Sequence, residues 1–139
     1  MGKINYARVV LGAIVAGVFY FLTDGVIHTV LGPYHLAALT GAGKALQGSS
    51  TDYIYFAVYD LVKGLVALLI YAGIRPRFGA GIKTAVWAGL VTWLACIVAP
   101  TIAAMPFPFY ERAYFYKLMA LSIIAVVLGA IIGAAIYKE

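Results

Sequence analysis

Four long apolar runs follow one another along the chain, separated by shorter stretches rich in glycine, proline and charge. As a helix, each run is longer than the roughly 30 Å hydrocarbon core of a bilayer. We therefore predict an all-α, polytopic membrane protein, a four-transmembrane-helix bundle that forms one domain over residues 1–139. The expected helices cover about residues 6–30, 53–74, 79–103 and 110–137, with an outer loop over 31–52.

The loop over 31–52 is the longest connection between the runs. Pro33 is expected to end the first helix, because proline has no amide hydrogen to donate. Leucines within the loop could form a short helix at the membrane interface, although Gly41 and Gly43 count against a stable one.

The second run carries two charges well inside it, Asp60 and Lys63. Lys63 lies roughly 15 Å along the helix from its start, which places it near the middle of the bilayer. A lone lysine there is costly, whereas a carboxylate three residues away can pair with it or share a proton with it. We therefore expect both side chains to face the interior of the bundle.

Small residues recur at helical spacing and predict faces where helices pack closely, because glycine lets two backbones approach each other. The last run contains Gly129 and Gly133, which match the G-x-x-x-G pattern of helix contacts in membranes. That contact can lie within the chain or between subunits. The candidate packing glycines are Gly12, Gly17, Gly81, Gly89, Gly129 and Gly133.

Composition supports an integral membrane protein. Hydrophobic residues make up 65% of the chain and charged residues 11%, and the mean hydropathy is +0.99, which leaves too little polar surface for a soluble globule. The net charge of +5 does not indicate a nucleic-acid partner, since the basic residues cluster at the ends of the runs. Cys96 is the only cysteine, so an intramolecular disulfide and a cysteine metal cluster are excluded.

The basic residues also orient the bundle. One side is expected to carry Lys3, Arg8, Arg75, Arg77, Lys83 and Lys138. By the positive-inside rule, both termini are predicted to be cytoplasmic and the loop over 31–52 external. An even number of spans agrees with this orientation.

Seven polar residues then fall in the outer half of the bundle and form a candidate polar cluster: Asp24, His28, Asp60, Lys63, Glu111, Arg112 and Lys117. They could bind a solute or relay a proton, or they could form a structural network that locks the helices together. Asp24 and His28 lie four apart on one helix face, which could hold a metal. Hydration at a helix end is the simpler interpretation, and we predict no metal site.

Signatures of known catalysis are absent, including H-E-x-x-H, G-x-S-x-G and the nucleotide-binding glycine patterns. We therefore predict no catalytic residues and no cofactor. Haem held by two histidines of this chain is not expected, because Gly32 and Pro33 separate His28 from His35. Either histidine could still serve as a single axial ligand to a haem or pigment.

The chain has a basic start, a polar first outer loop, a basic turn at Arg75-Pro76-Arg77 and a G-x-x-x-G last helix. In this whole-length pattern it resembles the small four-span integral membrane proteins of unassigned function that are common in bacteria. The resemblance implies a multi-pass protein of the bacterial inner membrane, and it implies no activity.

Three classes of function follow. The first expectation is a non-catalytic subunit or scaffold of a larger membrane complex, with other membrane subunits or copies of itself as partners. The alternative is a small proton-coupled transporter or carrier that uses the polar cluster. A membrane enzyme acting on lipid or quinone is the third. A polar cavity at depth would favour the carrier, and a free apolar flank bearing Gly129 and Gly133 would favour the subunit.

Overall fold

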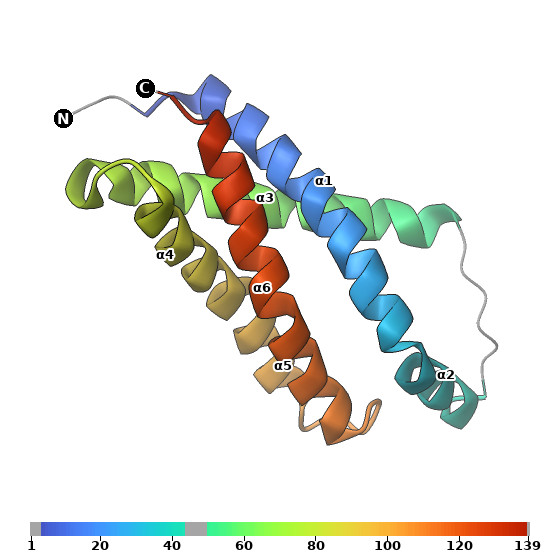
Figure 1. The fold of residues 1–139 in the computed structure, drawn as a ribbon. Coiled ribbons are helices and arrows are strands. Elements are labelled where there is room, and N and C mark those ends of the chain that lie inside the picture. The colour runs from blue at the N-terminus through green and yellow to red at the C-terminus, as the bar shows by residue number, and fades with distance from the viewer. Residues whose placement is uncertain (1–3, 44–49, 139) are drawn as a thin grey trace.

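A computed structural model describes residues 4–43 and 50–138, and every regular element in those ranges is a helix (Figure 1). The elements are α1 (Tyr6–Val30), α2 (Gly32–Gly41), α3 (Ser50–Phe78), α4 (Ile82–Trp93), the π-helical turn η1 (Leu94–Val98), α5 (Ala99–Ala104) and α6 (Arg112–Ile136). Four stretches are long and apolar enough to cross a membrane: Tyr6–Val30, Thr51–Phe78, Ile82–Ala104 and Arg112–Ile136. The prediction of an all-α chain with four helices able to cross a membrane is confirmed.

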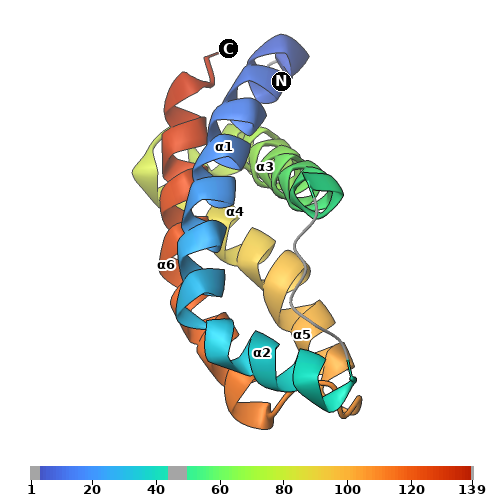
Figure 2. The same ribbon diagram turned by 90° about the vertical axis from the view of Figure 1, so that its right-hand side faces the viewer.

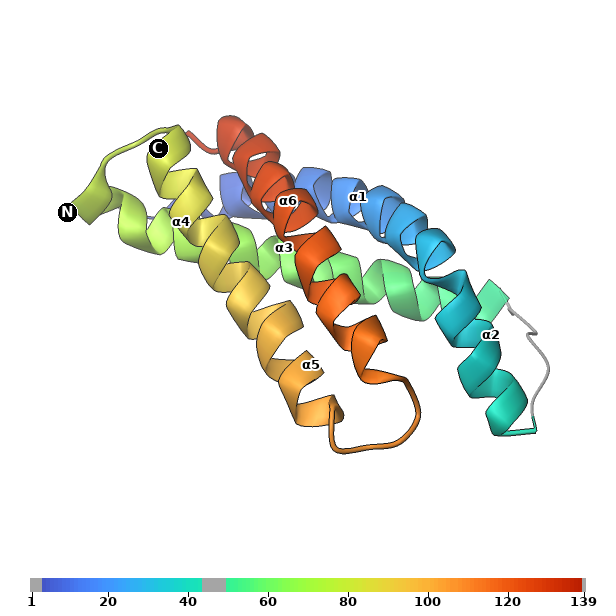
Figure 3. The same ribbon diagram turned by 60° about the horizontal axis from the view of Figure 1, so that its bottom comes forward.

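The helix α6 lies between α1 and α4, and α3 crosses behind all three (Figure 1). Two further views show that α3 lies close to α1 near the middle of both helices and moves away from α1 toward the end that carries α2 (Figures 2 and 3). The two chain ends lie together, because the Asn5 amide donates to the Tyr137 hydroxyl at 3.2 Å and the Asn5 side chain donates to the Lys138 carbonyl at 3.2 Å. Both ends of the described chain therefore share one side of the bundle.

The helices approach most closely where glycines face one another. A methyl group added at Gly12 would lie 2.7 Å from the carbonyl oxygen of Gly133, and one added at Gly133 would lie 2.7 Å from that of Gly12. Gly64 is tighter still, since a side chain there would collide with the carbonyl oxygen of Ala13. Small residues permit such backbone contact. In lipid, where the hydrophobic effect does not draw helices together, this close van der Waals packing stabilises their association.

The other candidate packing glycines divide into two groups. A Cβ at Gly17 would meet Leu61 of α3 at 2.9 Å, and one at Gly89 would meet Val127 of α6 at 2.8 Å. The ring of Tyr20 fills the space above Gly129. Gly81 does not pack against a helix: nothing described lies within 4 Å of its Cβ position, and its φ of 133° places it in a turn that needs a glycine.

The turn between the second and third spans lies later in the chain than expected. The helix α3 continues through Arg75, Pro76 and Arg77, so the expectation of a turn there is wrong. A proline so close to the end of a helix removes only one of the last hydrogen bonds. The helix ends at Phe78, and the next residue, Gly79, has a φ of 82° and an amide that donates to the Arg75 carbonyl at 2.8 Å.

Part of the expected outer loop is helical. The helix α2 begins at Gly32, directly after α1, and Pro33 occupies its first turn. An amide in the first turn of a helix has no partner within the helix, so proline costs nothing there and separates the two helices by starting the second. The helix ends before Gly43, whose φ is 68°, and residues 44–49 of the expected loop lie outside the described residues.

The third span contains a π-helical turn just before Pro100. Because Pro100 has no amide hydrogen, the carbonyl of Cys96 four residues earlier loses its usual helical donor. The Tyr59 hydroxyl of α3 donates to this carbonyl at 2.9 Å. The proline therefore creates an acceptor through which η1 is joined to α3.

Candidate functional site

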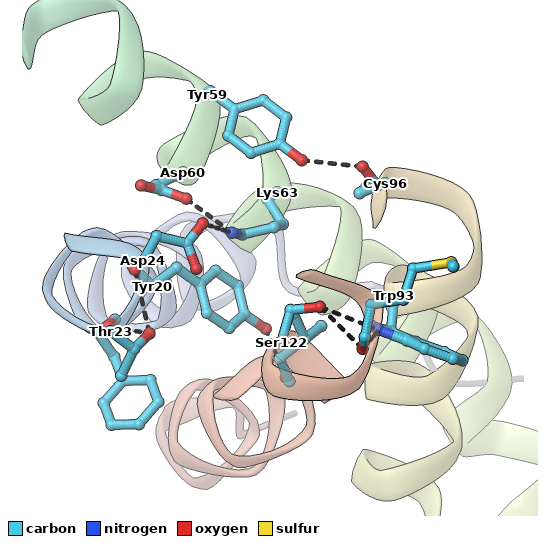
Figure 4. A network of polar contacts seen from close by, with 12 residues as sticks. Tyr20, Thr23, Asp24, Tyr59, Asp60, Lys63, Trp93, Cys96 and Ser122 are labelled. Carbon is cyan, nitrogen blue, oxygen red and sulfur yellow. Dashed lines mark hydrogen bonds and ion pairs between the residues drawn. The ribbon is translucent and has the colours of Figure 1, made fainter. Parts of the chain in front are cut away.

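Lys63 lies near the midpoint of the span Thr51–Phe78, and no part of its side chain is exposed. Its Nζ lies 2.6 Å from Oδ2 of Asp24 on α1 and 2.7 Å from Oδ1 of Asp60 on its own helix. The side chain of Asp60 is 2% exposed and that of Asp24 is 16% exposed. Figure 4 shows the three side chains converging between α1 and α3. We refer to Asp24, Asp60 and Lys63 as the charged triad.

The close crossing of α1 and α3 brings the triad together. Gly64 follows Lys63 and packs against Ala13 and Gly17 of α1. Asp24 lies seven residues beyond Gly17, roughly two helical turns along α1 and on nearly the same face. The glycine contact therefore sets the separation at which Asp24 can reach an ammonium on α3.

Two tyrosines enclose the ammonium of Lys63. Its Nζ lies 4.8 Å from the ring centre of Tyr20 and 5.0 Å from that of Tyr59, distances at which an aromatic ring stabilises a cation. The Tyr20 hydroxyl donates to the Val126 carbonyl of α6 at 2.9 Å. Neither tyrosine was predicted to join this site, although Tyr20 precedes Asp24 by four residues and Tyr59 precedes Lys63 by four. That spacing places each pair on one helix face.

The triad holds one positive and two negative formal charges. An unbalanced charge in the low-dielectric interior of a membrane protein is costly. A proton on one carboxylate makes the group neutral and still leaves Lys63 paired with the other carboxylate. The arrangement can therefore bind and release one proton without breaking up.

A second polar group lies beyond the triad, at the end of the bundle that carries α2. Nδ1 of His28 lies 3.0 Å from Nε2 of His35, and Nδ1 of His35 lies 3.2 Å from the Tyr110 hydroxyl. Burial and then the neighbouring His28 lower the pKa of His35 below its usual value of 6.5. His28 belongs to the predicted polar cluster, whereas His35 and Tyr110 were not predicted to join it.

The remaining members of the predicted cluster lie apart from the triad. Lys117 donates to the Tyr34 hydroxyl of α2 at 2.7 Å. The side chains of Glu111 and Arg112 are exposed at the start of α6 and make no hydrogen bond or ion pair to any residue that the structure describes. The seven residues predicted to form one polar cluster therefore do not form a single group of contacts in the structure.

A cavity of about 380 Å³ lies between α3, the η1–α5 segment and α6. Aromatic side chains form much of its lining, which comprises Tyr59, Cys96, Ile97, Pro100, Thr101, Ala104, Phe107, Phe109, Tyr110, Tyr114, Phe115 and Leu118. Tyr59 borders both the cavity and Lys63, and Tyr110 borders both the cavity and His35. The cavity therefore adjoins the triad at one lining residue and the histidine pair at another.

In the parts of the chain that the structure describes, no three histidine, cysteine or carboxylate side chains are placed to hold a metal ion together.

Comparison with known proteins returns no relative. No protein-family model, no curated protein and no solved structure matches this chain. The assignment of a function therefore depends on the charged triad and the groups around it.

Proposed function

We propose that this chain is a small proton-coupled carrier of the bacterial inner membrane, in which the charged triad binds and releases one proton in each transport cycle. The observation that carries the proposal is the complete burial of Lys63 between two carboxylates near the middle of a membrane span. A structural lock between α1 and α3 needs only one ion pair. The second carboxylate adds a charge that a proton can neutralise.

Proton binding in the triad would change how strongly α1 and α3 are joined. Asp24 belongs to α1, whereas Asp60 and Lys63 both belong to α3. A proton on Asp60 leaves Lys63 paired across the two helices, and a proton on Asp24 leaves it paired within α3 alone. Because the first state has an ion pair between helices and the second does not, moving the proton alters the attraction between the helices. This is the coupling that a proton-driven carrier requires.

The cavity beside Tyr59 is the proposed site for the cargo. Its volume of about 380 Å³ suits a small molecule, and its aromatic lining suits an apolar or aromatic one. Tyr59 connects the two sites, because its ring lies beside Lys63 and its hydroxyl bonds to the Cys96 carbonyl. A change in the charge of the triad would therefore alter the position of Tyr59 in the cavity wall.

The proposal can be tested in liposomes that contain the protein and a pH-sensitive dye. An inward proton gradient is imposed with and without a mixture of small molecules extracted from cells. The wild-type protein is expected to acidify the interior faster when the mixture is present, and Asp24→Asn is expected to abolish the difference. Glu111→Gln, which changes an exposed carboxylate outside the triad, is the control and should behave as wild type. Acidification no faster than in liposomes without protein would overturn the proposal.

We also propose that both termini face the cytoplasm and that α2 faces outward. Arg8, Arg75, Arg77, Lys83 and Lys138 support this orientation, whereas Lys3 and Glu139 lie outside the described residues. In a Cys96→Ala background, cysteines at Thr40 and at Lys138 should react with an impermeant reagent from opposite sides of the membrane. Reaction of both from the outside would contradict the orientation.

A second candidate function is that of a subunit of a larger membrane complex. It is favoured by the first half of α3, which extends past α1 (Figure 1) and has Tyr53, Tyr55 and Phe56 at least half exposed. Gly129 and Gly133 do not support it, since both are covered within the chain by Tyr20 and Gly12. Native mass measurement after gentle detergent extraction distinguishes the two candidates. A stable assembly with other chains or copies favours the subunit, and a monomer with a bound small molecule favours the carrier.

A further inference from the structure

Two histidines and a tyrosine form a continuous chain of hydrogen bonds at the outer end of the bundle. His35 of α2 is the central member, with its Nε2 3.0 Å from Nδ1 of His28 and its Nδ1 3.2 Å from the Tyr110 hydroxyl. All three side chains are partly exposed. We refer to Tyr110, His35 and His28 as the histidine arm.

The hydrogen bonds of the histidine arm can run in either direction. In one arrangement the Tyr110 hydroxyl donates to Nδ1 of His35, and Nε2–H of His35 donates to Nδ1 of His28. In the other, Nδ1–H of His28 donates to Nε2 of His35, and Nδ1–H of His35 donates to the Tyr110 oxygen. Both are possible because neutral imidazole has one donor and one acceptor nitrogen. A chain with two such arrangements can pass a proton along its length.

The arm leads toward the charged triad. His28 follows Asp24 by four residues on α1, so their Cβ atoms lie on one face at a separation of roughly 6 Å. Asp24 is also the triad member with the larger exposure, 16% against 2% for Asp60. A gap of one helical turn between two polar side chains is short enough for a bridging water.

We propose that the histidine arm is the outer route by which protons reach the charged triad, with His28 as the group that exchanges a proton with Asp24. This inference rests on the proposed function, because it assumes that the triad binds a proton.

Proton transfer along the arm needs no reactant other than water. The Tyr110 hydroxyl passes its proton to Nδ1 of neutral His35, which already holds a proton on Nε2, and the Tyr110 oxygen takes a replacement proton from water. The Nε2 proton then passes to Nδ1 of His28, which releases its own Nε2 proton toward the carboxylate of Asp24. Each histidine returns to a neutral form, with its remaining proton on the other ring nitrogen.

The charged groups around the histidine arm favour no more than one excess proton on its two histidines. His28 interacts electrostatically with Asp24 of its own helix and Lys63 of α3, and its ring lies 5.8 Å from Phe56. His35 contacts His28 of α1, Tyr110, and Tyr114 of α6. The residue before His35, Tyr34, accepts a hydrogen bond from Lys117 of α6. The positive charges of Lys63 and Lys117 and the closeness of the two rings oppose double protonation. Asp24 alone attracts a proton inward.

Infrared spectroscopy of the protein in a detergent that lacks carbonyl groups tests the route. The chain has five acidic side chains, of which Asp24 and Asp60 belong to the triad. A carboxylic acid C=O band that is present at neutral pH in the wild-type protein and absent from the paired variant Asp24→Asn/Asp60→Asn reports the triad. Transfer from H₂O to D₂O shifts the band, and the rate of the shift measures proton exchange.

We expect the wild-type band to shift rapidly and the His28→Gln band to shift on the order of 10²-fold more slowly, since glutamine keeps a hydrogen-bonding side chain but cannot carry a proton. His35→Gln should slow the exchange less, because it leaves His28 in place and opens it to water. Tyr34→Phe, which removes a hydroxyl of α2 that is outside the arm, is the control and should exchange as wild type does.

The outcomes separate the two proposals. Absence of the band from the wild-type protein would refute proton binding by the triad and the arm together. A band that shifts as fast in His28→Gln and His35→Gln as in wild type would overturn the arm alone and leave proton binding by the triad intact. Since α2 lies at the surface, His35→Gln provides the test if His28→Gln does not fold.

Discussion

Toward the end of the bundle that carries both termini, α1, α3 and α6 touch backbone to backbone, whereas near α2 aromatic rings lie between the helices. Gly12 and Gly133 face each other across the first contact, and Gly64 lies against Ala13. At the other end, Tyr110 and Tyr114 stack with ring centres 4.2 Å apart, and His35 lies edge-on to Tyr114 at 5.3 Å. The cavity opens among these rings.

The charged triad lies at the boundary between these two regions. Lys63 directly precedes Gly64, the residue at which α3 makes its closest contact with α1. Toward the start of α3, beyond Asp60, the helix is exposed on nearly all sides. In lipid no hydrophobic effect draws helices together, so side-chain shape decides where they meet and where they part. The triad therefore has a tightly packed region on one side and a cavity lined largely by aromatic side chains on the other.

Removing the Lys63 ammonium should have the largest effect on the stability of the folded chain. Lys63→Met is expected to lower the free energy of unfolding by about 3–5 kcal/mol, because two buried carboxylates then face each other with no cation between them. Asp60→Asn should cost less, about 1–3 kcal/mol, since Lys63 keeps its ion pair with Asp24. Unfolding in mixed micelles measures both.

The combined variant Lys63→Met/Asp60→Asn sharpens the test. It should be more stable than Lys63→Met alone, because it removes one of the two carboxylates left without a partner. Strictly additive losses would show that the charges do not interact.

The tightly packed region should respond to a single methyl group. Gly64→Ala is expected to lower the free energy of unfolding by about 1–3 kcal/mol, because the added Cβ collides with the backbone of Ala13 and the helices must separate. Gly73→Ala on the same helix is the matched control, since nothing described lies within 4 Å of its Cβ position. It should be neutral or slightly stabilising. Equal stability of the two variants would show that the glycine contact does not hold the helices.

A smaller effect is expected where the two regions meet at Tyr20. Its ring covers Gly129 and its hydroxyl donates to the Val126 carbonyl. Tyr20→Phe keeps the ring and loses the hydrogen bond, which should cost about 1 kcal/mol in the free energy of unfolding. Tyr53→Phe, at an exposed position, should cost nothing measurable in the same titration.

The smallest effect should be a pH dependence at the aromatic end. Because the pKa of His35 is lowered in the folded chain, both states are neutral at that residue above pH 6.5. As the pH falls below 6.5 the unfolded chain binds the proton first, so stability should fall until the folded form also binds it. The His35→Gln variant should lose this part of the pH dependence. A wild-type stability that rises on mild acidification would contradict the sign.

Local pattern explains which parts of the fold could be predicted. Apolar length predicts a membrane span whatever the span packs against, so the four spans follow from the sequence. The helix ends depend on single backbone hydrogen bonds, and a proline near an end can be accommodated. That is why the turn expected at Arg75-Pro76-Arg77 lies at Gly79–Gly81, and why Pro33 starts a helix.

The candidate site, like the fold, could be predicted from the sequence only in part. The sequence alone determines that Lys63 must be neutralised inside the bundle and that Asp60, three residues away, can do so, because a charge in lipid has no cheaper partner. Only the tertiary structure supplies Asp24, which reaches Lys63 from another helix at 2.6 Å. Spacing along one chain cannot specify which face of α1 meets α3. That choice depends on Gly17 and Gly64 fitting together, a match of shapes that exists only once the helices have packed.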